Sequence, residues 1–275
     1  MYNPALLPSQ FNNLAVSYGI LPGASGLANV NYTFAIDKIG TFGSALQYLS
    51  YGEIQGYDDT GALTNVFKPV EYTLLLSHAR QANNIRFGAN MKFTNTSIDG
   101  YHGNAILFDI GGLFIHPDRD FTVGAAIKNV GFVTSEFLDG GNTTLPFDIQ
   151  LGTSFKPLHM PVRFSVTMHQ MQQWNLMNSG EEINSFNTAL DNFFRHFVIG
   201  AEIILKEEFS LLAGYNHLIR KDLKQDQGGG LSGISLGFDI SIKAFDFTYA
   251  FGGYNLAGNN NTFTLAANLS EITTK

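Results

Sequence analysis

The sequence of 275 residues lacks cysteine altogether and carries little charge. Without cysteine, the chain has no disulfide framework, no thiol nucleophile and no thiolate metal site. Charged residues make up 14% of the chain, whereas soluble domains have about 25%. The net charge of -7 excludes the basic surface that nucleic-acid-binding proteins need. Phenylalanine (24), tyrosine (11) and glycine (29) are abundant instead, which suits strands with one apolar face and one small, polar face.

Long apolar runs are also missing. Residues 1–36 contain no charged side chain, but proline, glycine and asparagine interrupt them repeatedly. A transmembrane helix needs about 20 consecutive, mostly apolar residues, so this stretch does not predict one. It also lacks the basic and then apolar regions of a signal peptide. We therefore expect that, if the protein is exported, its signal lies upstream of Met1.

Strict alternation of apolar and polar side chains is the main structural signal. Phe147, Ile149 and Leu151 share one face, while Asp148 and Gln150 share the other. A period of two residues places alternate side chains on opposite faces of a β-strand. Fourteen segments follow this pattern: 12–21, 29–37, 40–51, 69–80, 85–94, 103–115, 121–128, 147–156, 162–169, 195–205, 209–216, 234–243, 245–252 and 262–270.

The connections between these segments are sorted by length. The tight ones all follow even-numbered segments: 37–39, 81–84, 116–120, 157–161, 206–208 and 243–244. The other set contains the long loops 52–68, 131–145, 171–193 and 220–230, with shorter members at 22–28, 98–102 and 253–261. Short periplasmic turns and longer extracellular loops are typical of transmembrane barrels, whereas a soluble sandwich has no reason to sort its loops in this way.

We therefore predict an all-β protein, a transmembrane antiparallel up-and-down β-barrel of about 14 strands. Residues 1–275 form a single domain, with the barrel over 12–271. An even strand count leaves both termini on the periplasmic side of the outer membrane. Residues 1–11, which include Asn3, Pro4 and Ala5, are expected to tuck into the lumen as a plug-like segment, with a disordered tail as the alternative.

The inward face of the predicted barrel carries a few charges of both signs. Ionisable groups inside a membrane are functional candidates, for example along an ion or substrate path. The balance of signs favours the other interpretation, in which opposite charges pair and fill a narrow lumen. The predicted lumen charges are Arg86, Lys92, Asp109, Lys128, Asp148, Arg163, Glu202, Asp239 and Asp246.

No motif for catalysis or metal binding is present. His116, Asp118 and Asp120 resemble metal ligands, but they lie in a five-residue connection where proline and aspartate are ordinary turn residues. HExxH does not occur, and the single GxSxG match, GISLG at 233–237, falls in the alternating segment 234–243 instead of at a strand-to-helix turn. We expect no enzyme activity, no metal and no cofactor, although bound lipid or detergent stays open. A site assembled from several strands is the remaining enzymatic alternative.

The long loops carry aromatic and apolar residues that are candidates for holding a partner, because exposed loops with aromatic anchors are plausible binding sites. The loop 171–193 is expected either to dock a partner or to fold inward as a constriction, and 183–194 could form a short helix. The candidate partner-binding residues are Tyr57, Phe67, Phe137, Leu138, Trp174, Leu176, Met177 and Phe186.

Two resemblances add to this interpretation. The Asn3-Pro4-Ala5 element ahead of a fourteen-strand barrel resembles the hatch region of the fatty-acid-transporter-like outer-membrane family. The chain as a whole is similar to the PorQ family of barrels in the Bacteroidetes type IX secretion system. That similarity rests on NPALLPSQFNNLAVSY (3–18), GTFGSALQYLSYGEIQGYDDTG (40–61), PFDIQLG (146–152), RHFVIGAEI (195–203), LLAGYNHLIRKDLK (211–224) and GISLGFDISIKAFDFTYAFGGYNLAG (233–258).

The PorQ resemblance implies a non-enzymatic scaffold in the attachment complex for protein secretion. Such barrels anchor a PorZ-like surface protein beside PorU-like and PorV-like components, which release cargo and attach it to lipopolysaccharide. The hatch resemblance implies the alternative, a barrel that moves hydrophobic solutes across the outer membrane. Family members carry a signal peptide and further residues before the Asn-Pro-Ala element, so the extent of any plug stays open.

Overall fold

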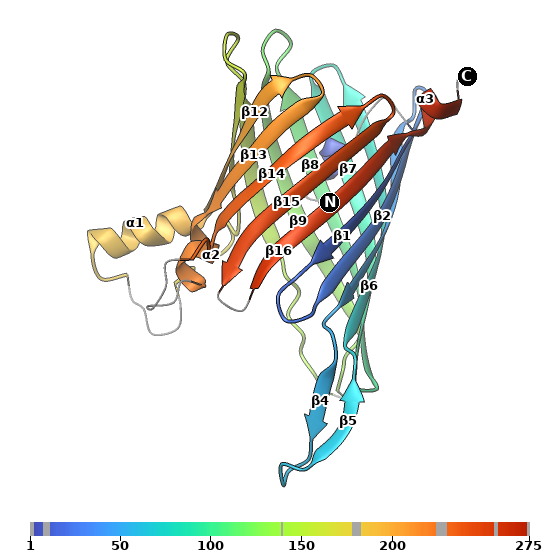
Figure 1. The fold of residues 1–275 in the computed structure, drawn as a ribbon, viewed down its shortest axis with the longest axis vertical. Helices are drawn as coiled ribbons and strands as arrows, with labels where there is room; N and C mark the ends of the chain where they lie inside the picture. Colours follow the sequence, from blue (N-terminus) through green and yellow to red (C-terminus); the bar gives the residue numbers. More distant parts are fainter. Residues whose placement is uncertain are drawn as a thin grey trace.

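The computed structural model describes residues 3–7, 12–138, 140–177, 183–223, 230–255 and 258–273. Its main body is a closed antiparallel barrel of fourteen strands, in which neighbours in the sequence pair and β1 pairs with β16 to close the sheet (Figure 1). The barrel strands are β1 (Asn13–Ile20), β2 (Gly26–Ile36), β3 (Gly40–Ser50), β6 (Val70–Ala82), β7 (Ile85–Ile98), β8 (Tyr101–Ile115), β9 (Phe121–Ser135), β10 (Asp148–Phe155), β11 (Val162–Met168), β12 (Phe197–Lys206), β13 (Phe209–Asn216), β14 (Ile234–Ile242), β15 (Phe245–Asn255) and β16 (Gly258–Asn268). The predicted fold class is confirmed.

The barrel is an inside-out fold, with apolar side chains on its outer surface. Val16, Leu74, Ile110 and Leu236 are each more than 40% exposed on that surface. In lipid, a sheet must close on itself because unpaired backbone groups have no water to bind. Closure with an apolar exterior therefore makes this a membrane barrel.

The two rims of the barrel differ. The turn rim, as we call it, joins strands through connections such as 207–208 and 243–244, and the short helix α3 (Leu269–Thr273) lies there (Figure 1). The opposite rim, called the loop rim below, carries the long connections 51–69, 136–147 and 169–196. The long connections lie at one rim as predicted, although the loop rim also has a two-residue connection at 99–100.

Strand β9 is longer than the predicted segment 121–128, because it continues through residues that were expected to open the loop 131–145. A β-bulge interrupts its pairing with β8 between Phe108 and Ile110, and Asn129 has a positive φ of 59°. A bulge adds one residue to one strand, so the apolar positions change phase at this point. The alternation stops there in the sequence, although the strand does not.

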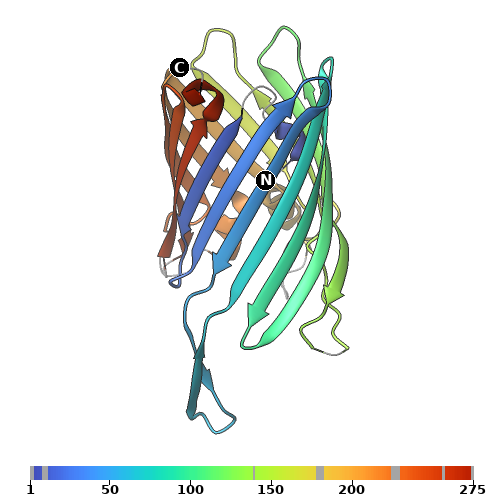
Figure 2. The same ribbon diagram turned by 90° about the vertical axis from the view of Figure 1, so that its right-hand side faces the viewer.

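The loop rim also contains structure that was expected to be loop. Strands β4 (Ile54–Tyr57) and β5 (Leu63–Phe67) form a hairpin within 52–68, and Figure 2 shows it projecting well beyond the rim. Helices α1 (Phe186–Arg195) and α2 (His217–Asp222) also lie at this rim. The short helix expected over 183–194 is thereby confirmed. None of the helices in the described residues is long and apolar enough to cross a membrane.

Candidate functional site

A short N-terminal segment occupies part of the barrel interior. The plug, Asn3–Leu7, includes the 3-10 turn η1 (Pro4–Leu6), and it contacts β6, β7 and β8. Ala5 and Leu7 are 0% and 2% exposed. The side chain of Asn3 caps the turn by accepting a hydrogen bond from Ala5 N (2.9 Å), and it donates to the backbone oxygens of Gly112 and Ala125 (3.2 Å each). A side-chain cap and wall hydrogen bonds thus hold the plug in one position.

Glycines in the wall make room for the plug. A Cβ atom on Gly88 would lie 2.4 Å from the carbonyl carbon of Pro4, and one on Gly111 would lie 2.0 Å from Oδ1 of Asn3. Glycine within a strand commonly marks a place where another backbone approaches closely. The guanidinium of Arg86 adds a hydrogen bond to the carbonyl oxygen of Leu7 (3.0 Å). The predicted lumen charge Arg86 therefore contacts the predicted plug.

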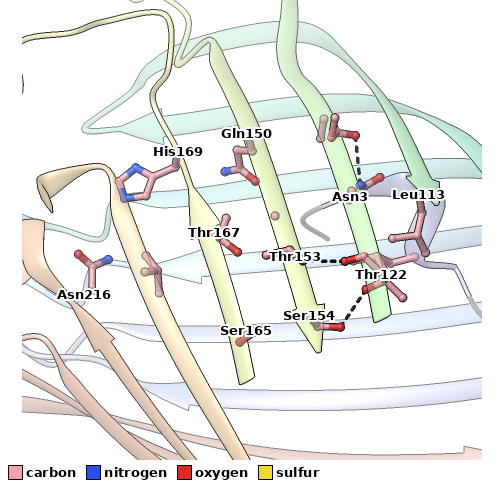
Figure 3. A pocket seen from close by; sticks show the side chains of 16 residues that line it. Asn3, Leu113, Thr122, Gln150, Thr153, Ser154, Ser165, Thr167, His169 and Asn216 are labelled. Atoms are coloured by element: carbon pink, nitrogen blue, oxygen red, sulfur yellow. Dashed lines mark hydrogen bonds between the residues drawn. The ribbon is translucent and has the colours of Figure 1, made fainter. Parts of the chain in front are cut away.

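Beside the plug lies a cavity of about 620 Å³ (Figure 3). Small polar side chains and glycines of β9 to β13 form most of its wall, with apolar contributions from Leu6 and Leu113. The labelled side chains are Asn3, Leu113, Thr122, Gln150, Thr153, Ser154, Ser165, Thr167, His169 and Asn216. The plug and this cavity therefore lie side by side in the barrel interior. The cavity lining mixes hydroxyl and amide groups with apolar side chains.

The wall next to the plug contains a buried ion pair. Nζ of Lys92 lies 2.7 Å from Oδ1 of Asp109, and the Asp109 side chain is fully buried. Asp109 also accepts hydrogen bonds from Asn90 Nδ2 and from the backbone N–H of Asn129 (2.9 Å each). Lys92 donates to the side-chain oxygen of Asn129 as well. This cluster of four side chains ties three neighbouring strands together at the β9 bulge.

A second ion-pair cluster lies near the turn rim. Arg163 contacts Glu202 (2.7 Å) and Asp120 (2.8 Å). Asp120 belongs to the connection 116–120, so sequence reasoning did not include it among the lumen charges. In the same connection, Nδ1 of His116 accepts the backbone N–H groups of Asp118 and Arg119 (3.1 Å each). Within the described residues, no group of three or more His, Asp or Glu side chains could hold a metal ion.

The remaining four predicted lumen charges lie on β9, β10, β14 and β15. Asp148 accepts a hydrogen bond from the backbone of Gln170 (2.7 Å) and stands opposite Lys128 in the β9–β10 register. Asp239 accepts one from Thr248. Asp246 lies opposite Ser241 in the β14–β15 register. Lys128 also interacts electrostatically with Lys92 and Asp109, so Lys128 and Asp148 adjoin the buried ion pair, whereas Asp239 and Asp246 lie apart on β14 and β15.

The predicted partner-binding residues divide into two regions of the loop rim. On the hairpin, Tyr57 is 64% exposed and Phe67 lies at its base. Leu138 follows the end of β9 at the loop rim and is 63% exposed. The ring of Phe137 packs against Gly103 instead.

The other region surrounds α1. Trp174 and Phe186 are 61% and 76% exposed. Leu176 is half-buried, and its backbone is fixed by Asn192 Oδ1 (2.8 Å) and Arg195 Nη1 (3.1 Å). Met177 is half-buried too. This part of the loop lies at the rim against α1.

A buried polar cluster that the sequence did not reveal holds α1 in place. Asn192, Arg195 and His196 are at most 2% exposed. Arg195 bridges Asp191 (3.1 Å) on its own helix and Asp222 (3.0 Å) on α2. The one sequence signal for this cluster is the spacing of four residues between Asp191 and Arg195, which is typical of an ion pair along a helix.

Acid should loosen the contact between α1 and α2. Burial alone would raise the pKa of Asp191, but hydrogen bonds from Lys221, His217 and Arg195 more than offset this and lower its pKa to about 2. A depressed pKa stabilises the folded state above the ordinary value of 3.8, and this contribution is lost as the pH falls towards 2. We expect acrylamide quenching of Trp174 fluorescence to rise over that range. Asp191→Asn should show the raised quenching already at neutral pH, and an unchanged response in that variant would contradict this role.

Comparison with known proteins supports the architecture. The TodX monoaromatic hydrocarbon channel deltaS2 mutant has a TM-score of 0.57 at 13% identity, over 96% of this chain and 91% of that chain. The deltaS2S3 mutant of the same channel has a TM-score of 0.55 at 12% identity, with the same coverage. A Pseudomonas aeruginosa FadL homologue reaches a TM-score of 0.48 at 12% identity, over 96% and 92% of the two chains.

No protein-family model and no curated protein matches the sequence. At these identities the structural likeness to TodX concerns the fold alone. Together with the apolar exterior, it shows that the chain has the fold of a membrane-spanning β-barrel.

Proposed function

We propose that this barrel is a non-enzymatic scaffold that holds a surface partner through its loop rim, with the β4–β5 hairpin as the main docking element. The observation that carries the proposal is the hairpin itself. It stands clear of the barrel in both views (Figures 1 and 2). In this assignment the loop rim faces the cell exterior and both termini are periplasmic.

The hairpin exposes large apolar side chains to the surrounding water. Leu63 is 67% exposed and Val66 is 55% exposed. A sheet of two strands alone is marginally stable in water, and its outer edges offer unpaired backbone groups to a further strand. These properties are typical of a surface that acquires a partner by strand addition or by apolar contact.

The hairpin is nevertheless preorganised. Oδ1 of Asp58 accepts the backbone N–H groups of Thr60 and Ala62 (2.9 Å each) at the tip. Asn65 donates to Asp99 on the β7–β8 connection (2.7 Å), which fixes the hairpin against the rim. A preformed binding element loses less conformational entropy when it binds. By the sequence resemblance, the partner would be a PorZ-like surface protein, with PorU-like and PorV-like components in the same complex.

Replacing residues 54–67 with a Gly/Ser linker of equal length should release the partner while the barrel still folds. A single truncation, Leu63→Ala, should weaken binding by about tenfold or more if Leu63 is an interface anchor. The measurement is co-purification of the PorZ-like protein from detergent-solubilised outer membranes. Leu158→Ala is the matched control, because Leu158 is equally apolar and 82% exposed but lies at the turn rim. Retained partner in the linker variant would refute docking at the hairpin.

The cavity beside the plug favours a second candidate function, passage of a small solute through the barrel. The fold is shared with a channel described as carrying monoaromatic hydrocarbons. Here the lining mixes Leu6 and Leu113 with hydroxyl and amide groups, so the solute would need both apolar and hydrogen-bonding surface. Flux of such a solute into liposomes should then rise in a variant whose plug is displaced; equal flux in that variant and the wild type would refute this candidate.

A further inference from the structure

Within the described residues, one face of helix α1 is largely uncovered. Phe186, Leu190 and Phe194 recur at the spacing of one helical face, and they are 76%, 39% and 48% exposed. The opposite face carries Asn192 and Arg195, which are buried against the loop and α2. The helix is therefore strongly amphipathic, with its polar face turned inward and its apolar face turned out. This is the reverse of a helix that packs on a soluble core.

The apolar face of α1 is continuous with the lipid-facing wall of the barrel. Phe197, the first residue of β12, shares the outward face with Ile199, which is 47% exposed. The rings of Phe193 and Phe194 lie 4.9 Å and 6.5 Å from the ring of Phe197. Trp174 extends the same cluster, 6.4 Å from Phe193. One aromatic surface thus runs from the barrel wall onto the helix.

The wall is short where α1 is attached. Strands β10, β11 and β13 have 8, 7 and 8 residues, whereas β7, β8 and β9 have 14, 15 and 15. A tilted strand needs about 9–11 residues to cross the hydrocarbon core. β10, β11 and β13 fall short of that length, whereas β12, into which α1 leads, has 10 residues and reaches it. In Figure 1, α1 extends sideways from this side of the barrel, away from its axis.

We propose that α1 is an interfacial helix, with its apolar face seated in the lipid leaflet at the loop rim. An amphipathic helix of this kind lies in the membrane plane, with its apolar face about 5–10 Å below the headgroup boundary. The aromatic cluster would continue the apolar belt of the barrel where the wall is short. The ion pairs from the buried Arg195 to Asp191 and Asp222 hold the helix against α2. The exposed aromatic residues of α1 are thereby assigned to lipid, and the hairpin remains the element for a protein partner.

The test uses the single tryptophan of the chain. Phe186→Trp in a Trp174→Phe background places the fluorophore on the exposed face of α1. The full-length protein is reconstituted in phosphatidylcholine vesicles whose acyl chains are brominated either near the headgroup or near the methyl end. We expect headgroup-side bromine to quench the fluorescence by about half or more, and methyl-end bromine to quench it less, because an interfacial helix lies near the headgroups. Aqueous iodide should have little effect.

Two control positions calibrate the signal in the same background. Tyr57→Trp, on the hairpin, should respond to iodide and not to brominated lipid, whereas Leu236→Trp, on the outward wall, should respond to brominated lipid. If Phe186→Trp behaves like the hairpin control, the face is open to water or reserved for a protein, and the proposal is wrong. If that variant does not fold, the wild-type Trp174 gives the same measurement, with the same result expected. Neither result bears on docking at the hairpin, so the two proposals succeed or fail separately.

Discussion

Replacing Asp109 with alanine is expected to lower the free energy of unfolding by about 3–5 kcal/mol, because breaking a buried ion pair leaves an uncompensated charge. The Asp109 side chain is 0% exposed and that of Lys92 is 12% exposed, so water cannot replace the missing partner. The substitution also removes the acceptor for the backbone N–H of Asn129, which holds the β9 bulge. The measurement is equilibrium unfolding in urea, in detergent micelles, of the wild type and the variant.

A double variant that removes both charges shows how much of the lost stability comes from leaving Lys92 without its ion-pair partner. Lys92→Met with Asp109→Leu removes both charges and keeps the volume, and replacing a buried pair in this way is often neutral or stabilising. We therefore expect the double variant to be more stable than Asp109→Ala. Asp246→Ala is the matched single variant, since Asp246 is a half-buried carboxylate on the inner face. An equal loss of stability in Asp109→Ala and Asp246→Ala would contradict the account of this cluster.

Replacing Gly111 with valine is expected to displace the plug from the lumen without unfolding the barrel. Its Cβ would lie 2.0 Å from Oδ1 of Asn3, which is well inside contact distance. Asn3 would then lose its hydrogen bonds to the wall, and Leu7 would leave the buried position it holds near Gly43. The cavity beside the plug should then extend into the vacated space, so the single-channel conductance in planar bilayers should rise severalfold.

The neighbouring glycine provides the control. A Cβ on Gly112 meets no atom within 4 Å, and this residue is on the outward face of β8, where valine suits a lipid-facing strand. Gly112→Val should therefore leave the conductance unchanged. A labelling experiment gives an independent readout, because the chain has no cysteine of its own. Leu6→Cys should react faster with a soluble maleimide when combined with Gly111→Val than with Gly112→Val. Equal conductance and equal labelling in the two backgrounds would refute the plug assignment.

The strands could be predicted from the sequence because each one has a lipid-facing and a lumen-facing side, and that division imposes a strict period of two. The prediction was incomplete where the period breaks. At Asn129 the bulge shifts the phase of β9, and a run of alternation cannot reveal a strand that changes phase. The hairpin strands β4 and β5 have 4 and 5 residues, too few to show a period amid residues that face water on both sides.

The sequence allowed us to predict which residues line the lumen. It did not allow us to predict which of them contact one another. Lys92 and Asp109 could both be assigned to the lumen, yet their pairing depends on which inward positions stand side by side. Nothing in the sequence distinguishes Gly111 from the other strand glycines, and only the three-dimensional arrangement shows that Asn3 occupies the space beside it. Arg195 and Asp222 are 27 residues apart in the sequence, and no local sequence pattern predicts their contact.

Site-specific photo-crosslinking in native outer membranes tests the central claim most directly. A photoreactive amino acid at Leu63 places the probe near the hairpin tip, and one at Leu236 places it on the outward, lipid-facing wall. The scaffold account predicts a protein adduct that contains the PorZ-like partner from Leu63 and none from Leu236. A folded barrel with the probe at Leu63 that gives no such adduct would contradict the account.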